Sequence, residues 1–360
     1  MVRVRIVLSG YYGFDNVGDE AILFSIIQAL RENDASLNIT VLSNQPEKTV
    51  ATYGVDAVNR WDMKQVMAAL KQSDGLISGG GSLLQDKTGF RSVPYYAGIM
   101  KMAQMNGKPV FVYAQGMGPI TRGINRWITR SVLKKTHITV RDEASKNLLR
   151  EIGLKNDIET VPDPVLGISL SSQKSEWWEQ QAFEGSVVTV SVRDWPSEID
   201  FKMKIAAGLD RVAQDGVTVV FIPMHDEHDD VASKEVAALM KEASVIAPYH
   251  ASIEEKILII GSSNLLVGMR LHALIFSSVM ETPFIALSYD PKIDAFADIA
   301  GQPIAGHVNE EGWDGNSLAE LVQAKLSREE EEVRMLRQRI VPLQEKAKLT
   351  ARQALQYFKS

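Results

Sequence analysis

Short apolar segments alternate with helical spacing through most of this sequence. In the first half the apolar segments are residues 4–8, 39–42, 75–78, 110–114, 137–140 and 158–161. Helical spacing occurs between them, for example at 20–31 and 63–72. Ile6, Val7 and Leu8 are apolar without alternation, which is typical of a strand buried on both faces. Alternating strands and helices predict a parallel sheet with helices on both sides.

The pattern stops between residues 167 and 184 and then begins again. Residues 171–175 are polar without a period and precede Trp177 and Trp178, so we predict a linker at 171–184. Beyond it we predict strands at 187–192, 217–222, 258–260, 265–267 and 284–287. Helices are predicted at 202–215, 232–243, 253–260 and 272–280, the third of which overlaps a predicted strand.

The two series predict two Rossmann-like domains, at residues 1–170 and 185–326, and a C-terminal helical segment at 327–360. Ser327 and Glu330 fit a capping box at the start of that segment. Pro342 is expected to kink or split the helix, because proline lacks a backbone N–H. The many charges of the segment are typical of a solvated face.

Composition limits the possible functions. The chain has 360 residues, of which 45% are hydrophobic and 23% charged, as expected for a globular protein of two domains. Its net charge of −6 argues against a broad nucleic-acid-binding surface. The lack of cysteine excludes disulfides, thiolate nucleophiles and cysteine-bound metals. No run of about 18 apolar residues and no signal-peptide pattern occurs, so we expect a cytoplasmic protein.

Candidate functional residues are sought at the strand ends. Rossmann-like folds bind ligands at the carboxyl ends of their strands, and two such domains would leave a cleft between them. The loop after the first strand is rich in glycine but lacks the dinucleotide motif G-x-G-x-x-G. In it, Asp15 and Asp19 suit a sugar hydroxyl or a general base better than a pyrophosphate. The alternative is that Asp19 caps the following helix and that Asp15 is a turn residue.

Glycines also follow two other strands of the first half. Gly79, Gly80 and Gly81 precede Ser82, and Gly116 follows Gln115. Successive glycines are typical of a backbone that a ligand approaches closely, although a flexible loop is the alternative. We therefore expect these strand ends to form one wall of the cleft, which a Gly80→Val substitution would obstruct while leaving the fold intact. At the next strand end, Arg141 either pairs with a neighbouring carboxylate or binds an anionic ligand.

Positive side chains follow strands of the second half. Arg193 comes directly after one strand, and Arg270 and His272 follow another at the start of an apolar helix. An arginine there opposes the helix dipole unless an anion is bound, although a capping histidine beside a surface arginine is the alternative. Tyr289 and Lys292 follow the last clear strand. His225 and His228 lack the spacing of a zinc site, so no metal is expected.

Five of these motifs occur together in a known family. They are Gly10…Gly13…Asn16-Val17-Gly18-Asp19-Glu20, Gly79-Gly80-Gly81-Ser82, Gln115-Gly116-Met117-Gly118-Pro119, Arg141-Asp142 and Arg270-Leu271-His272. Through them the chain resembles the polysaccharide pyruvyl transferases, in particular the bacterial CsaB type, over most of its length. The resemblance implies two Rossmann-like domains in a GT-B-like arrangement.

The resemblance also implies an activity. Pyruvate is transferred from phosphoenolpyruvate to a sugar as a cyclic ketal. In the CsaB type the acceptor is similar to a lipid-diphosphate-linked disaccharide with a β-linked N-acetylmannosamine, and the 4,6-ketal belongs to a secondary cell wall polymer that S-layer homology domains recognise. The Arg-Leu-His element is implied to hold phosphoenolpyruvate.

Phosphoenolpyruvate carries two anionic groups, so its site requires several cations. We expect it to be bound by Arg193, Arg270, Leu271, His272, Tyr289 and Lys292. His272 is expected to protonate its methylene carbon, and Asp15 or Asp19 to take the proton of the attacking hydroxyl. The residues expected to line the cleft on the acceptor side are Gly13, Asn16, Gly79, Gly80, Gly81, Ser82, Gln115, Gly116 and Arg141.

No cofactor is expected besides the donor substrate, and the acceptor is expected at the inner face of the cytoplasmic membrane. Direct membrane contact and an oligomer are left open. Two other classes of function are also left open. One is a sugar-nucleotide-dependent glycosyltransferase of the same fold, and the other is a non-catalytic carbohydrate-binding protein.

Overall fold

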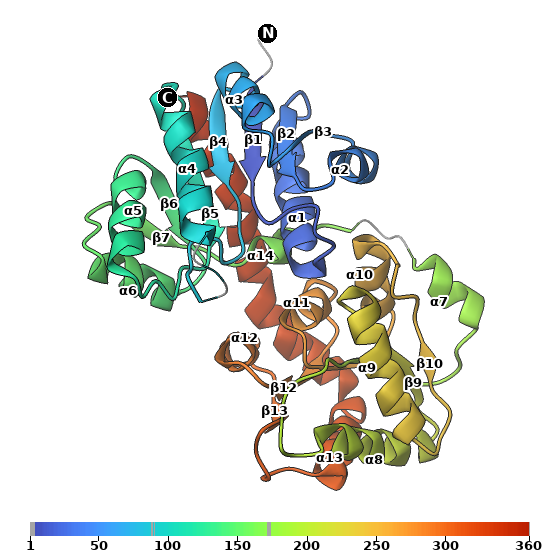
Figure 1. Ribbon diagram of the computed structural model, residues 1–360. Helices are drawn as coiled ribbons and strands as arrows, with labels where there is room; N and C mark the ends of the chain where they lie inside the picture. The colour runs from blue at the N-terminus through green and yellow to red at the C-terminus, as the bar shows by residue number, and fades with distance from the viewer. Residues whose placement is uncertain (1–3, 88, 90, 171–173, 360) are drawn as a thin grey trace. The chain divides into compact units, whose positions relative to one another are not determined.

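The computed structural model describes residues 4–87, 89, 91–170 and 174–359, and within them the chain forms two compact α/β units (Figure 1). Unit 1 comprises the chain up to Ile168 and from Leu343 onward, and unit 2 runs from Ser169 to Pro342. Of the linker predicted at 171–184, residues 171–173 lie outside the described residues, and the rest contains a helix, α7 (Glu176–Gln181).

The described part of unit 1 forms a seven-stranded parallel sheet in the order β3-β2-β1-β4-β5-β6-β7. Its strands are β1 (Arg5–Ser9), β2 (Asn38–Ser43), β3 (Asp56–Asn59), β4 (Gly75–Ser78), β5 (Val110–Gln115), β6 (His137–Val140) and β7 (Ile158–Thr160). Its helices are α1 (Val17–Asn33), α2 (Pro46–Tyr53), α3 (Met63–Gln72), α4 (Ser92–Met105), α5 (Gly123–Leu133), α6 (Glu143–Glu151) and the 3₁₀ helix η1 (Pro164–Gly167).

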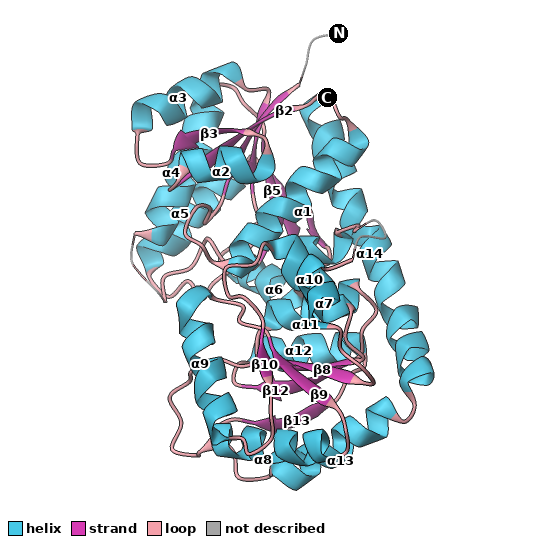
Figure 2. Cartoon of the chain, turned by 90° about the vertical axis from the view of Figure 1, so that its right-hand side faces the viewer, coloured by secondary structure: helices cyan, strands magenta, loops and turns pink. Residues whose placement is uncertain are grey.

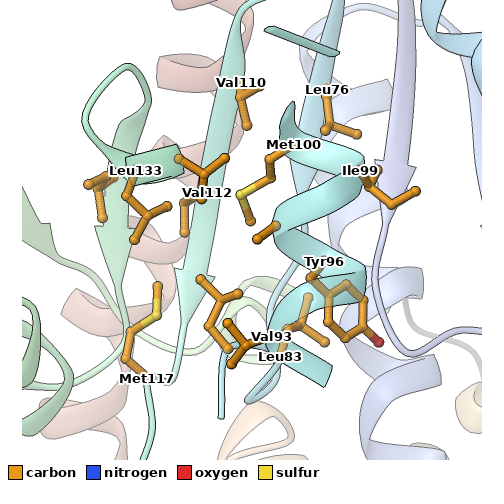
Figure 3. Close-up of a cluster of buried hydrophobic side chains, with 14 of the residues drawn as sticks. Leu76, Leu83, Val93, Tyr96, Ile99, Met100, Val110, Val112, Met117 and Leu133 are labelled. Carbon is orange, nitrogen blue, oxygen red and sulfur yellow. The ribbon is translucent and has the colours of Figure 1, made fainter. Parts of the chain in front are cut away.

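Alternate residues of each strand of unit 1 face opposite helical layers. On one face, Val110 and Val112 of β5 pack with Ile99 and Met100 of α4 in a buried apolar cluster (Figure 3). On the other face, the ring of Phe111 lies 6.2 Å from that of Tyr357, near the end of the chain. Both faces are therefore covered, as the continuous apolar strands require.

The described part of unit 2 forms a six-stranded parallel sheet in the order β10-β9-β8-β11-β12-β13. Its strands are β8 (Val187–Ser191), β9 (Thr218–Phe221), β10 (Val245–Ile246), β11 (Leu265–Gly268), β12 (Phe284–Ser288) and β13 (Ile304–His307). The helices after α7 are α8 (Phe201–Gln214), α9 (Asp226–Leu239), α10 (Ile253–Gly261), α11 (Leu271–Val279), α12 (Pro291–Ala300), α13 (Gly315–Leu326) and α14 (Glu329–Lys359). Figure 2 shows that the strands of each unit lie between helices.

The two Rossmann-like units confirm the predicted fold class. The predicted strands agree with observed strands to within a few residues, with one exception: residues 258–260 belong to helix α10. Ser252 caps this helix by accepting a hydrogen bond from the backbone N–H of Glu255. Residues 256–260 are all buried, so the apolar run marks a buried helix rather than a strand. Within the described residues, no helix is long and apolar enough to cross a membrane.

The C-terminal helix α14 belongs to both units. It continues through Pro342, where the division between the units falls, so of the two predicted effects of proline, a kink or a split, the split does not occur. The capping box predicted at Ser327 is also wrong, because Ser327 ends α13 and donates its hydroxyl to the carbonyl of Ala324. Beyond Pro342, Lys346 donates to the carbonyl of Thr160 at 2.8 Å, so this part of the helix covers the sheet of unit 1.

Gly80 lies inside unit 1 and not on an exposed wall. A Cβ atom at this position would lie 2.9 Å from Cγ2 of Ile22 in α1 and 3.6 Å from Pro164. A valine side chain here would therefore press on helix α1, while its effect on a ligand site stays a prediction. Gly80 is required because helix α1 packs directly against the backbone after β4.

We predict that Gly80→Val destabilises the protein by roughly 1–3 kcal/mol, the usual cost of adding atoms to a packed interior. Urea denaturation followed by circular dichroism measures this change. Gly98→Ala in α4 is the matched control, because nothing lies within 4 Å of a Cβ there. The control should gain roughly 0.5–1 kcal/mol of stability, since alanine favours helix over glycine. Equal stability of Gly80→Val and the wild type would refute this packing.

Candidate active site

The predicted acceptor residues lie at the carboxyl ends of four neighbouring strands of unit 1. Sheet order places β1, β4, β5 and β6 side by side. Beyond the strands the pairing continues, since Gly81 forms a bridge with Gln115 and the N–H of Gly116 donates to the carbonyl of Gly81 at 2.9 Å. The N–H of Arg141 donates to the carbonyl of Gln115 at 3.2 Å. Backbone hydrogen bonds therefore bring these separate motifs together.

Asn16, and not Asp19, is the N-cap of helix α1. Its side-chain oxygen accepts hydrogen bonds from the N–H groups of Gly18 at 3.0 Å and Asp19 at 3.3 Å. Asp15 is a turn residue with a left-handed backbone (φ +58°), and its carboxylate accepts a hydrogen bond from Lys48 at 2.5 Å. Gly13 also has a positive φ, of +77°, and donates its N–H to Glu20 at 2.7 Å. The loop after β1 is thus fixed by its own polar contacts.

Asp19 is free of the capping role, and its carboxyl group lies against Gly81. An added Cβ at Gly81 would come within 2.8 Å of Oδ1 of Asp19. The pKa of Asp19 is raised to about 7, mainly by burial and also by the negative charges of Glu20 and Asp163, while the positive charge of Arg141 opposes the rise. A carboxyl group with this pKa can exchange a proton near neutral pH.

Arg141 pairs with a carboxylate, the first of the two alternatives for this residue. Its Nη1 lies 3.5 Å from Oδ2 of Asp163, and its Nη2 donates to the hydroxyl of Ser82 at 3.3 Å. Gly116 makes room for the guanidinium group, because a Cβ there would lie 2.9 Å from it. Gln115 is fully buried and donates to Ser78 at 2.6 Å.

Two buried residues at this end of the sheet were not singled out from the sequence. Tyr12 is fully buried against Gly10 and Gly79, and its hydroxyl group makes no hydrogen bond to the described residues. Burial raises the pKa of Tyr12, and the charge of Asp19 adds to the effect. Arg60 follows β3, a strand that the sequence analysis did not predict, and donates to the carbonyl of Gly10 at 2.8 Å. The only signal for Arg60 in the sequence was a single basic residue directly before Trp61.

In unit 2, the predicted donor residues follow three neighbouring strands. Gly268 of β11 is paired with Ser191 of β8 and with Ala286 of β12, so the carboxyl ends of these strands are adjacent. The residues that follow them are Arg193 and Trp195 after β8, Arg270, Leu271 and His272 after β11, and Tyr289 and Lys292 after β12. The loop after β8 extends as far as β13, since Ser197 donates to the carbonyl of Val308 at 2.9 Å.

Arg193 and Tyr289 are brought together, as predicted for the donor site. The guanidinium group donates to the tyrosine hydroxyl at 2.9 Å and lies 4.6 Å from the ring centroid of Tyr289 and 5.1 Å from that of Trp195. Its Nε donates to the carbonyl of Asp194. Both hydrogen-bond acceptors are uncharged, and the Asp194 carboxylate binds Lys202 at 2.8 Å instead. Arg193 therefore keeps positive charge that can attract an anion.

Arg270 already has an anionic partner. Its guanidinium group binds both carboxylate oxygens of Asp229, a residue that is 1% exposed, with Nε at 2.9 Å from Oδ2. The anion that the sequence analysis expected beside this arginine is present in the chain itself, as the Asp229 carboxylate, and the binding of donor by Arg270 stays a prediction. Arg270 fixes the turn that leads into the first helical residues, Leu271 and His272, both of which are half-buried.

Lys292, His225 and His228 are the remaining residues of unit 2 that the sequence analysis considered. Lys292 lies in the first turn of α12, 3.6 Å from the carboxylate of Asp290. The rings of His225 and His228 stack at 5.7 Å. Among the described residues, no group of three or more His, Asp or Glu side chains is arranged to hold a metal ion.

A histidine that the sequence analysis missed lies at the end of β13. Nε2 of His307 lies 2.6 Å from Oδ1 of Asp294, and Ser288 donates to the other carboxylate oxygen at 2.7 Å. Backbone pairing places Ser288 directly beside His307. Because β13 was not predicted, nothing in the sequence connected these three residues.

Comparison with known proteins gives a family match over most of the chain. The model of the polysaccharide pyruvyl transferase family matches residues 16–291. The amylovoran biosynthesis protein AmsJ of Erwinia amylovora is 20% identical, in an alignment that covers 88% of this chain and 91% of that protein. The matched segment contains every predicted site residue except Gly13, Asp15 and Lys292.

Solved structures with the same fold are more distant in sequence. A putative UDP-N-acetylglucosamine 2-epimerase from Listeria monocytogenes has a TM-score of 0.70 at 12% identity, covering 100% of this chain and 96% of that one. HepE of Anabaena, in complex with UDP-glucose, has a TM-score of 0.61 at 11% identity, covering 98% and 100%. At these identities the likeness shows the fold alone, which is GT-B-like as predicted.

We predict that Arg270→Ala destabilises the protein by roughly 3–5 kcal/mol, because it leaves the Asp229 carboxylate buried and unpaired. The double variant Arg270→Ala with Asp229→Ala should be more stable than the single variant. Urea denaturation of the wild type, both single variants and the double variant gives the coupling free energy. Additive effects of the two substitutions would contradict the pairing.

Proposed function

This chain belongs to the polysaccharide pyruvyl transferase family, and on that premise we propose that it transfers pyruvate from phosphoenolpyruvate to two hydroxyl groups of a sugar, as a cyclic ketal. The observation that carries the proposal is the gathering of Arg193, Tyr289 and the Arg270-Leu271-His272 element after three adjacent strands of unit 2. Such a strand-end cluster is where Rossmann-like folds bind their ligands.

The donor side of the proposal follows from charge. Phosphoenolpyruvate has a phosphate and a carboxylate, and each can accept two parallel hydrogen bonds from a guanidinium group. Arg193 binds one of these two anionic groups. Tyr289 holds the Arg193 guanidinium group in place through its hydroxyl group and its ring. Lys292 contributes a second charge. Arg270 acts as a positioning residue, because its charge is matched by Asp229 and its place determines where His272 lies.

The reaction balances without redox chemistry or an added cofactor. His272 gives a proton to the methylene carbon of phosphoenolpyruvate, which becomes a methyl group and leaves positive charge on C2. One sugar hydroxyl adds to C2 and loses its proton, the bond from C2 to the phosphate oxygen breaks, and a second hydroxyl adds and loses its proton. Of the two hydroxyl protons released, one replaces the proton given by His272 and the other leaves with phosphate.

The acceptor side is assigned to unit 1, with Asp19 as the base. Of the two carboxylates considered, Asp15 is bound to Lys48, whereas Asp19 is buried with a pKa of about 7. Arg141 and Ser82 lie at the same strand ends and supply polar groups for sugar hydroxyls, while the buried Gln115 supports the backbone beneath them. As the acceptor we propose a lipid-diphosphate-linked disaccharide that contains N-acetylmannosamine. It would be modified as a 4,6-ketal at the cytoplasmic membrane face, during synthesis of a secondary cell wall polymer.

Calorimetry with phosphoenolpyruvate and, separately, with UDP-glucose tests the donor. Binding of phosphoenolpyruvate supports the proposal, and binding of UDP-glucose alone would support a sugar-nucleotide glycosyltransferase instead. Mass spectrometry of a saccharide incubated with enzyme and phosphoenolpyruvate then detects the ketal. Failure of both substrates to bind would favour a carbohydrate-binding protein.

We predict that Arg193→Ala weakens phosphoenolpyruvate binding by about 1.5–3 kcal/mol, or roughly 10- to 150-fold, as expected for lost charge-assisted hydrogen bonds. Titration calorimetry measures the dissociation constant. Arg211→Ala is the control, since Arg211 lies in α8 of the same unit and binds Asn316 at 3.0 Å. Unchanged donor affinity in Arg193→Ala would remove Arg193 from the donor site.

We predict that kcat/KM for the acceptor rises with pH through about 7, because only the deprotonated Asp19 carboxylate can accept the hydroxyl proton. Asp19→Asn should lose roughly 10²- to 10⁴-fold in turnover. Arg141→Gln should move the rising limb to higher pH, since the guanidinium group favours the ionised carboxyl. A comparable loss in Asp15→Asn, with Asp19→Asn near wild type, would transfer the role to Asp15.

A further inference from the structure

Aromatic rings gather around one buried arginine in unit 1, outside the residues considered so far for the acceptor. The guanidinium carbon of Arg60 lies 4.6 Å from the ring centroid of Tyr95, 5.1 Å from those of Phe14 and Trp61 and 5.5 Å from that of Tyr96. Arg60 itself is only 3% exposed. Four rings from three segments of the chain are therefore arranged around a single cation.

Hydrogen bonds fix Arg60 in this place. It donates to the carbonyl of Gly10, and to the hydroxyl of Tyr96 at 3.2 Å. The hydroxyl of Tyr95 donates to the carbonyl of Arg60 at 3.0 Å. The strand-end loops of β1 and β3 are thus joined to the first turns of α4, where Tyr96 also closes the apolar cluster of unit 1 (Figure 3).

Part of this aromatic group is open to solvent, although large rings are usually buried. Trp61 is 58% exposed and Tyr11 is 41% exposed. The ring of Tyr11 stacks on Phe14 at 4.1 Å with an angle of 6° between the planes. Trp61 packs on Tyr95 at 5.4 Å, and its indole N–H donates to Asn44 at 2.9 Å. The exposed rings are therefore already held in place before any ligand arrives, which lowers the entropic cost of binding.

We propose that this aromatic platform, defined by Tyr11, Phe14, Trp61 and Tyr95, binds a pyranose ring of the saccharide acceptor. A pyranose presents C–H groups on its faces and hydroxyl groups around its edge, so it fits flat aromatic rings beside polar side chains. Polar side chains of this kind lie beside the platform. Asn44 accepts the hydrogen bond of the Trp61 indole, and Asp15, the residue after Phe14, is paired with Lys48. The acidic chain as a whole disfavours a polynucleotide on these rings.

The platform and the proposed base both lie at the carboxyl-end edge of the sheet of unit 1, since Arg60 follows β3 and Asp19 follows β1. Arg60 is among the charges that influence the pKa of Asp19, and Tyr12 lies beside Gly10, to which Arg60 donates a hydrogen bond. This inference rests on the proposed function for the identity of the ligand as an acceptor. It adds a sugar subsite in which Trp61 and Tyr95 lie outside the five sequence motifs, and Tyr11 and Phe14 lie between the named residues of the first motif.

Saccharide binding without donor provides the test. Saturation-transfer NMR is recorded with the methyl β-glycosides of N-acetylmannosamine, glucose and galactose, using the full chain. Trp61→Ala should weaken binding of the preferred glycoside roughly five- to tenfold, the effect of losing one aromatic stacking partner. Trp61→Phe should retain part of the affinity because it keeps a ring. Trp127→Ala is the matched control, since Trp127 is 65% exposed on α5 of the same unit and lies outside the platform.

Turnover gives a second readout. In Trp61→Ala the KM for the acceptor should rise while kcat and the KM for phosphoenolpyruvate stay at the wild-type values. Circular dichroism melting checks the fold, and Tyr11→Ala replaces Trp61→Ala if that variant unfolds. Equal glycoside binding by the wild type and the platform variants, or no glycoside binding by the wild type, overturns the platform. Binding of uridine monophosphate there in place of glycosides also overturns it.

Failure of the proposed function has a different signature. If phosphoenolpyruvate does not bind in calorimetry but glycoside binding still depends on Trp61, the pyruvyl transfer assignment fails and the platform stands. If phosphoenolpyruvate binds and is consumed, and Trp61→Ala leaves the acceptor KM unchanged, the platform fails and the transfer assignment stands.

Discussion

Hydrogen bonding between parallel strands determines which side chains of this chain can act together. Every strand of a parallel sheet ends at the same edge as its neighbours, so residues far apart in the sequence meet there. In unit 1 the pairing even continues past β4 and β5, through Gly81 and Gln115. In unit 2 the register of β8, β11 and β12 gathers cationic and phenolic side chains. Both proposed half-sites depend on this one constraint.

Burial then gives the charged groups of the two units opposite properties. In unit 2, Asp229 is neutralised by a two-point contact with Arg270, so its charge contributes structure and no chemistry. In unit 1, Arg141 approaches Asp163 only at 3.5 Å and opposes the effects of burial on Asp19 incompletely. Burial raises the pKa of Asp19 to about 7 in spite of the nearby guanidinium group, whereas Asp229 is bound at two points by a guanidinium group of its own. The same residue types therefore serve as framework in one unit and as a candidate base in the other.

The sequence predicted every described strand that contains buried apolar residues, including β7 with its single buried isoleucine, and missed three strands that contain none. β3, β10 and β13 are short and no residue in them is fully buried, so they carry little apolar signal. Arg60 and His307 were missed with them, because each is recognised only as a strand-end residue. The partner of Arg270 could not be predicted either, since Asp229 lies 41 residues away and on another helix. Long-range pairing of this kind is a property of the tertiary fold and leaves no local pattern.

The division of α14 between the units has a consequence for synthesis of the chain on the ribosome. The face of β4 and β5 in unit 1 is covered by Phe358, which packs against Gly75, and by Tyr357, which packs near Phe111. These residues are made long after the sheet they cover. N-terminal domains generally fold as soon as they are synthesised. Unit 1 cannot complete its core in this way, because part of that core is synthesised only after unit 2. Nascent chains that stop within unit 2 would expose an aromatic and aliphatic surface of unit 1, a target for chaperones and for aggregation.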